Sequence, residues 1–140
     1  MNKHIRLIPA LALGIAVLSI PTLATAATTV TVGPQSLLVA KGAGAVVSVE
    51  VTCAFGDNIS ARDANIKQLV KKDFVFGSGG GAGVIFCTGD IQLFEILVPA
   101  QSTAFSKGSA IATVSVFVCN SDSSVCVNTR VDPEIQLVNK

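Results

Sequence analysis

The ten residues from Val46 to Phe55, VVSVEVTCAF, alternate between apolar and polar side chains. An extended chain points successive side chains to opposite faces, so every second residue shares a face. One face of this stretch is apolar, and the other is polar or charged; the apolar face consists of Val47, Val49, Val51 and Cys53. β-branched residues in this arrangement are typical of a half-buried strand. The stretch therefore predicts a β-strand with one face in a core.

The same alternation recurs in residues 110–119, where every second side chain from Ala112 to Val118 is apolar. Shorter strands are predicted at residues 28–32, 36–40, 84–88, 91–98 and 134–138, with turn signals rich in Gly, Pro and Asp between them. Strands at this spacing, without a convincing long helix, are typical of a sandwich. We therefore expect an all-β fold, an immunoglobulin-like Greek-key β-sandwich of about seven or eight strands.

One segment fits two structures. Residues 60–63, SARD, resemble a helix-capping box, and Ile66, Leu69 and Val70 keep helical spacing, which predicts a possible short helix near residues 60–70. Alternatively, residues 66–75 form a strand, in which Phe74 and Phe76 alternate around Val75. The all-β context favours the strand.

Residues 1–26 have the pattern of a cleaved bacterial signal peptide. Lys3 and Arg6 precede the apolar residues 7–20, and Ala24 and Ala26 form an A-x-A cleavage site. The apolar run is too short for a membrane-spanning helix, which needs about 20 apolar residues. We therefore expect residues 27–140 to form a single exported domain, secreted or held in the periplasm or cell envelope.

The exported part contains four cysteines, which in an oxidising compartment predict two disulfides with three possible pairings. Cys119 and Cys126 enclose only six turn-forming residues, so we pair them with each other. Cys53 then pairs with Cys87. The alternative, a metal site of four thiolates, lacks the close C-x₂₋₄-C spacing that such sites use.

Composition narrows the possible functions. Residues 27–140 carry eight basic and nine acidic side chains and no histidine. A net charge near −1 gives no electrostatic support for binding nucleic acid or an anionic membrane. Without histidine, catalytic triads that use it and His-containing zinc sites are excluded. The acidic residues lie mostly in or beside turns, where they bond the local backbone. We expect no enzyme activity, no cofactor and no metal.

The segment Gly77–Gly89, GSGGGAGVIFCTG, matches the dinucleotide-binding pattern G-x-G-x-x-A through Gly77, Gly79 and Ala82. A phosphate-binding loop must open a helix, whereas a β-type run follows here. We therefore interpret the glycines as a mobile surface loop. Two candidate interaction loops result: one contains Asp57, Asn58, Arg62 and Asp63, and the other contains Gly77, Ser78, Gly79, Gly80 and Gly81.

All seven aromatic residues are phenylalanines, and we expect most of them in the core: Phe55, Phe74, Phe76, Phe86, Phe94, Phe105 and Phe117. One or two exposed phenylalanines beside the glycine loop would mark a hydrophobic cleft or a protein contact. Lys67, Lys71 and Lys72 form a small basic cluster, which we expect to be a solvated face.

Several short motifs follow one another along the chain: VTVGP at residues 30–34, the strand ending in Cys53, GSG at 77–79, CTG at 87–89, FSKGSAIA at 105–112 and the C-x₆-C of Cys119 and Cys126. In this order they resemble a family of small exported all-β domains of unknown function found in bacteria, especially actinobacteria. The resemblance implies a fold and an exported location, and no activity. A weaker resemblance is to neocarzinostatin-type apoproteins, which are also exported sandwiches with two disulfides.

Three functions remain open. We expect an exported interaction module, a monomer that binds an unknown protein or envelope component. The first alternative is a structural subunit of a surface layer or filament, which the high apolar content, few charges and strand edges favour. The second is a small-ligand carrier or hydrolase inhibitor, which would need an apolar cleft.

Overall fold

The computed structural model describes residues 27–139, so the predicted signal peptide lies outside the described residues. The described chain contains one short 3-10 turn, η1 (Ala40–Gly42), and nine strands. The strands are β1 (Thr29–Val32), β2 (Gln35–Val39), β3 (Gly44–Thr52), β4 (Asn58–Val70), β5 (Asp73–Phe86), β6 (Gln92–Pro99), β7 (Gly108–Cys119), β8 (Cys126–Val131) and β9 (Glu134–Asn139).

The nine strands form seven rows, where a row is one strand position across the sheet. β1 and β2 lie end to end in one row, and β8 and β9 lie end to end in another, so these two rows are interrupted. β1 and β2 pair in turn with one edge of β3, while β6 pairs with the other edge. Likewise β8 and β9 share one edge of β7, and β4 occupies the other. Each interruption contains a proline, Pro34 or Pro133, which has no N–H to donate to a neighbouring strand. β3 pairs with β6 and β4 pairs with β7, so strands that are not consecutive in the chain are neighbours, as in the predicted immunoglobulin-like Greek key; the strands number nine and not seven or eight.

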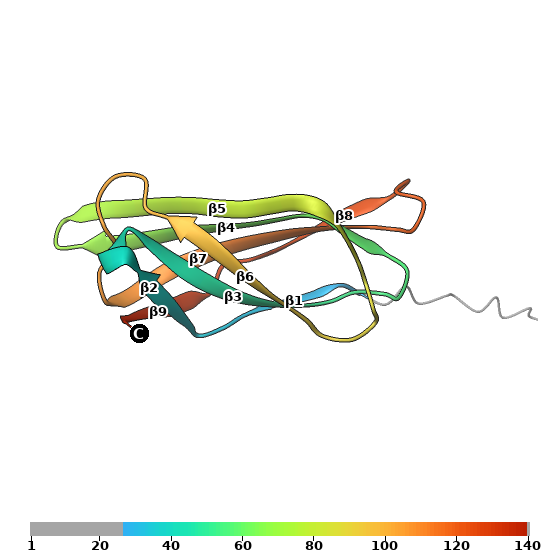
Figure 1. Cartoon of the computed structure of the whole chain (residues 1–140), viewed down its shortest axis with the longest axis horizontal. Helices are drawn as coiled ribbons and strands as arrows, with labels where there is room; N and C mark the ends of the chain where they lie inside the picture. The colour runs from blue at the N-terminus through green and yellow to red at the C-terminus, as the bar shows by residue number, and fades with distance from the viewer. Residues whose placement is uncertain (1–26, 140) are drawn as a thin grey trace, which may run out of the picture.

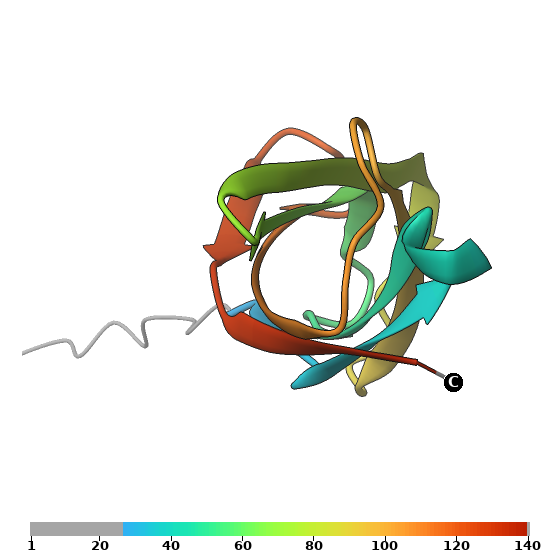
Figure 2. The same ribbon diagram turned by 90° about the vertical axis from the view of Figure 1, so that its left-hand side faces the viewer.

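The rows curl into a sandwich whose two layers are joined on one side (Figures 1 and 2). One layer contains β1, β2, β3 and β6, and the other contains β4, β5, β7, β8 and β9. The parallel pair β2–β9 connects the layers, so all nine strands belong to one mixed sheet. On the opposite side, β5 meets the end of β6 through a single bridge between Gly77 and Ala100.

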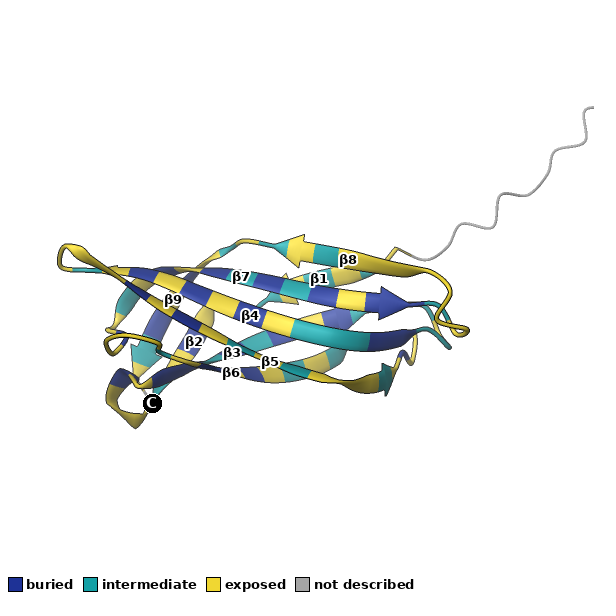
Figure 3. Cartoon of the chain, turned by 90° about the horizontal axis from the view of Figure 1, so that it is seen from above, coloured by how far each residue is buried: buried dark blue, intermediate teal, exposed yellow. Residues whose placement is uncertain are grey.

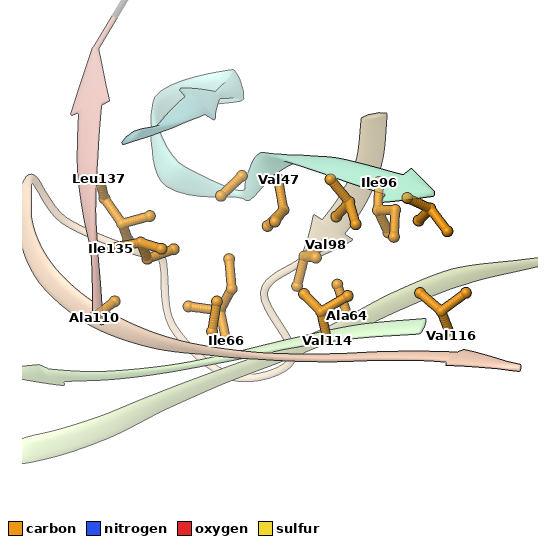
Figure 4. Packing of buried hydrophobic residues seen from close by; sticks show 14 of the residues in the cluster. Val47, Ala64, Ile66, Ile96, Val98, Ala110, Val114, Val116, Ile135 and Leu137 are labelled. Carbon is orange, nitrogen blue, oxygen red and sulfur yellow. The ribbon is translucent and has the colours of Figure 1, made fainter. Parts of the chain in front are cut away.

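The core lies between the layers and is built from the alternating residues (Figures 3 and 4). The predicted inner faces are confirmed: Val47, Val49, Val51 and Cys53 of β3, and Ala112, Val114, Val116 and Val118 of β7, are all buried. Ile66 of β4 and Ile96 and Val98 of β6 pack with them. Burial of apolar surface at about 25 cal/mol per Å² makes this interior the main source of stability.

The possible short helix near residues 60–70 is wrong, because this segment is the middle of β4. β4 is paired on both edges, with β5 and with β7, and contains a register shift between Ile59 and Ala61. Ile66 is buried in the core, whereas Leu69 is exposed on the opposite face. That result follows from the two-residue period of a strand, which separates residues an odd number of positions apart.

Both predicted disulfides are confirmed. Cys53–Cys87 ties the end of β3 to the connection after β5, and Cys119–Cys126 joins two residues that face each other in the β7–β8 pair. Two disulfides are consistent with an oxidising compartment. Among residues 27–139, no helix is long and apolar enough to cross a membrane.

Candidate interaction surface

The glycine-rich segment is a strand and not the predicted mobile loop. Residues 77–83 lie inside β5, and residues 77–82 pair with β4, with Gly80 opposite Asp63 and Gly81 opposite Arg62. The two candidate interaction loops, predicted as separate, are thus largely adjacent strands of one sheet. Only Asp57 stays in a connection, and Asn58 is the first residue of β4.

β5 needs glycine because β6 crosses close against its inner face. A Cβ atom at Gly77 would lie 2.6 Å from the carbonyl oxygen of Pro99, and one at Gly79 would overlap the carbonyl oxygen of Leu97. Both obstacles are backbone atoms, which cannot rotate away. Glycine in a strand often marks such a close backbone approach, and a loop prediction from composition alone misses it.

The remaining predicted site residues point in different directions. Asn58 is buried and donates to the carbonyl oxygen of Asn120 at 3.1 Å, so it has a structural contact. The guanidinium of Arg62 lies 5.3 Å from the centroid of the Phe94 ring. Asp63 is exposed and lines a polar hollow of about 440 Å³ with Ser78 and Gly79 of the glycine segment. The structure therefore brings Asp63 and Ser78 together on the outer face of the sheet, with the backbone of Gly79 beside them.

The phenylalanine prediction is wrong for most of the seven residues. Phe105 is buried at 3% exposure, and Phe94 is partly buried against the core. Five side chains are exposed instead, with exposed fractions of 85% for Phe55, 71% for Phe86, 52% for Phe74, 44% for Phe76 and 37% for Phe117. The inner positions of the strands are occupied mainly by Val, Ile and Ala, so the larger rings lie outside.

Phe74 and Phe76 belong to an apolar cluster on the outer face of β4, β5 and β7, which we call the aromatic face: Lys67, Leu69, Phe74, Phe76 and Ile111. Lys67 faces Phe76 on one side and Ile111 on the other, and Leu69 faces Phe74. All five side chains are exposed. Next to them lies a groove of about 350 Å³, lined by Lys67, Leu69, Phe74, Ile111 and the start of β9.

Lys67 holds the centre of the aromatic face. Its amino nitrogen lies 4.2 Å from the centroid of the Phe74 ring and 5.7 Å from that of Phe76, and the two ring centroids are 6.1 Å apart. A cation over an aromatic ring contributes about 0.5–1 kcal/mol at an exposed site. These contacts stabilise a conformation in which the Lys67 side chain packs against both rings.

The turn between β4 and β5 is the sequence feature that locates this surface. Lys71 and Lys72 form a two-residue hairpin connection between β4 and β5. Counting outward from that turn pairs Leu69 with Phe74 and Lys67 with Phe76, since strand pairing in a hairpin is set by its turn. The position of the turn was the missing information.

Two exposed carboxylates have lowered pKa values. Hydrogen bonds from Arg130 and Thr113 hold the pKa of Asp132 below its ordinary range, with Arg130 at 3.0 Å. The hydrogen bonds of Ser124, in the short loop closed by Cys119–Cys126, lower the pKa of Asp122. Both carboxylates are therefore charged at neutral pH.

Within residues 27–139, no group of three His, Cys, Asp or Glu side chains could hold a metal ion. The aromatic face consists of four apolar side chains around the amino group of Lys67. Compared with known proteins, the chain matches no family model and no curated protein.

Proposed function

We propose that this chain is an exported, non-catalytic β-sandwich that binds a protein or envelope component through its aromatic face. The observation that carries the proposal is the grouping of Leu69, Phe74, Phe76 and Ile111 around Lys67 on one exposed sheet face. Contiguous exposed apolar patches on soluble domains mark interaction sites. Aromatic residues are enriched in the cores of protein interfaces, whereas scattered single apolar residues carry no such meaning.

Export and bacterial origin belong to the same proposal. The signal-peptide pattern of residues 1–26 supports export, and the two disulfides agree with an oxidising destination. Membership of the family of small exported bacterial all-β domains, which the motifs of the chain resemble, remains a prediction. In that family the resemblance implies no activity, so binding must be argued from the surface itself.

A small-ligand carrier is the weaker alternative. The groove beside the aromatic face, about 350 Å³ in volume, has room for a small ligand. However, ligand sites bury most of their ligand in a concave pocket. The residues around this groove are mostly exposed strand residues, which suits a flat protein contact better. Native mass spectrometry of the purified protein would reveal a retained ligand.

The test is affinity capture of partners from the native cell envelope with matched variants. Phe74→Ser with Phe76→Ser is expected to reduce capture by about 30-fold or more, since a central aromatic anchor contributes about 2 kcal/mol or more to an interface. Phe55→Ser with Phe86→Ser removes two rings that lie elsewhere and are more exposed, and is expected to leave capture of the partner unchanged. Equal capture by both variants, or equal loss, would reject the aromatic face as the recognition surface. Circular dichroism confirms that each variant is folded.

A further inference from the structure

Four of the five lysines of the described chain gather toward one end of the sandwich. Lys41 lies in η1, Lys71 and Lys72 form the β4–β5 turn, and Lys107 lies in the β6–β7 connection. Contacts hold these connections together: Phe105 donates its N–H to the carbonyl oxygen of Gly42 at 2.8 Å, and the Gln68 side chain bonds the backbone of Ser106. Figure 2 faces this end. We call the four lysines the basic end; the acidic residue beside them is Asp73.

The opposite end carries the opposite charge. Its three connections, residues 53–57, 87–91 and 120–125, contain Asp57, Asp90 and Asp122 and no lysine or arginine. Cys53–Cys87 and the hydrogen bond from Asn58 to Asn120 hold the connections side by side. We call these three carboxylates the acidic end. The small net charge of the whole chain thus conceals a separation of charged side chains along its length.

Exposed apolar side chains accompany the acidic end. Phe55 and Phe86 are the most exposed phenylalanines, and Ile91, in the β5–β6 connection, is 66% exposed. Apolar side chains that stay in contact with water do not stabilise the fold, whereas they stabilise a contact in which a partner covers them. The acidic end therefore suits a partner surface that is positively charged and offers apolar side chains or lysine stems to cover the rings.

Two of the four lysines occupy positions that favour glycine. Lys41 has a φ of 58° and Lys71 a φ of 59°, both in the left-handed region. A residue with a side chain is strained there, and Gly is the usual occupant of such turn positions. Strained residues tend to be kept where they serve a function. Ala40 and Ser123 share this conformation, so the basic end is distinguished by its charge and not by its backbone.

We propose that copies of this chain associate head to tail, with the basic end of one molecule docked on the acidic end of the next. A second copy is the partner that carries both required surfaces. Pairing between two identical ends would place like charges together, so the contact is heterologous and repeats along the molecule's long axis. This goes beyond the proposed function, uses a different surface from the aromatic face, and departs from the monomer expected from the sequence.

Sedimentation velocity over a protein concentration series tests the proposal. At about 10 mM salt, where the Debye length is about 30 Å, the average mass is expected to rise with concentration; at about 1 M salt, where it is about 3 Å, the protein is expected to be monomeric. Lys71→Glu with Lys72→Glu, and separately Asp57→Lys with Asp90→Lys, are each expected to abolish association. Asp63→Lys with Glu95→Lys, which makes the same charge change as the second variant in mid-strand, is the control.

An equimolar mixture of the two end variants provides the decisive outcome. Neither associates alone, but the mixture contains one native basic end and one native acidic end, so pairing is expected to return. A monomer at every salt concentration overturns the proposal, as does association that survives both end variants or high salt. Binding of the monomer to anionic vesicles through its lysines would assign the basic end to a membrane instead. Phe74→Ser with Phe76→Ser is expected to associate normally, which separates this test from that of the proposed function.

Discussion

Replacing Gly79 by alanine is expected to lower the free energy of unfolding by about 3 kcal/mol, because the added methyl group has no place to go. The obstacle is the backbone of Leu97 and Val98 in β6, which crosses the inner face of β5 at this point. To admit the methyl group, β6 must move away from β5, which opens the side of the sandwich held by one bridge, Gly77 to Ala100. Urea unfolding followed by far-ultraviolet circular dichroism measures the change, since the chain has no Trp or Tyr for fluorescence.

Gly81 supplies the matched control, two residues further along the same face of β5. A Cβ atom there meets only the guanidinium of Arg62, at 3.1 Å from its nearest nitrogen, and that flexible group can shift. Gly81→Ala is therefore expected to change stability by less than about 1 kcal/mol. Equal losses in the two variants would mean that β6 does not lie against Gly79. If alanine at both positions leaves stability unchanged, the interpretation of the glycines as a loop would be restored.

Removing the Cys53–Cys87 disulfide, by replacing both cysteines with alanine, is expected to cost about 4 kcal/mol. The bridge spans 34 positions, and in the chain-entropy description a longer loop restricts the unfolded chain more. Both sulfurs are also buried against the core, so the smaller alanines leave a cavity that adds to the loss. The same bridge orders the acidic end, and the variant is expected to show faster amide hydrogen exchange there.

The Cys119–Cys126 disulfide is the internal comparison, because it spans only seven positions. Replacing this pair by alanine is expected to cost about 2.5 kcal/mol. Parallel urea unfolding of the two double variants under identical conditions gives the ranking directly. A larger loss for the short bridge would contradict both the entropic argument and the placement of Cys53 and Cys87 in the core.

Local patterns in the sequence were sufficient for β3, β7 and the two disulfides. β3 and β7 alternate so regularly that their inner faces could be assigned residue by residue, and the short spacing of Cys119 and Cys126 determined the pairing of all four cysteines. Each of these features depends on neighbours in the chain. The structure has nine strands and not seven or eight because β8 (Cys126–Val131) was not predicted, whereas the strands on either side of Pro34 and the strand after Pro133 were.

The glycines and phenylalanines could not be placed by such patterns. Gly79 is glycine because of Leu97, 18 positions away, and nothing in the composition of the segment indicates that crossing. Phe74 and Phe76 are outside because Val75 between them faces the core. The alternation of side chains was visible in the sequence, but the sequence did not indicate which of the two faces is buried. Similarly, net charge reports the number of lysines and carboxylates and not their separation to opposite ends.

Site-specific photo-crosslinking in the native envelope tests the central claim, recognition through the aromatic face, most directly. A photoreactive phenylalanine analogue, p-benzoylphenylalanine, replaces Phe76 in one variant, Phe117 in a second and Phe55 in a third. Phe117 is exposed on the same layer but nearer the other end, and Phe55 lies at the acidic end. The expected result is a discrete crosslinked product with another envelope component from position 76 and none from position 117, whereas position 55 crosslinks only to a second copy of this chain. A partner product from position 117 or 55, with none from position 76, would contradict the claim.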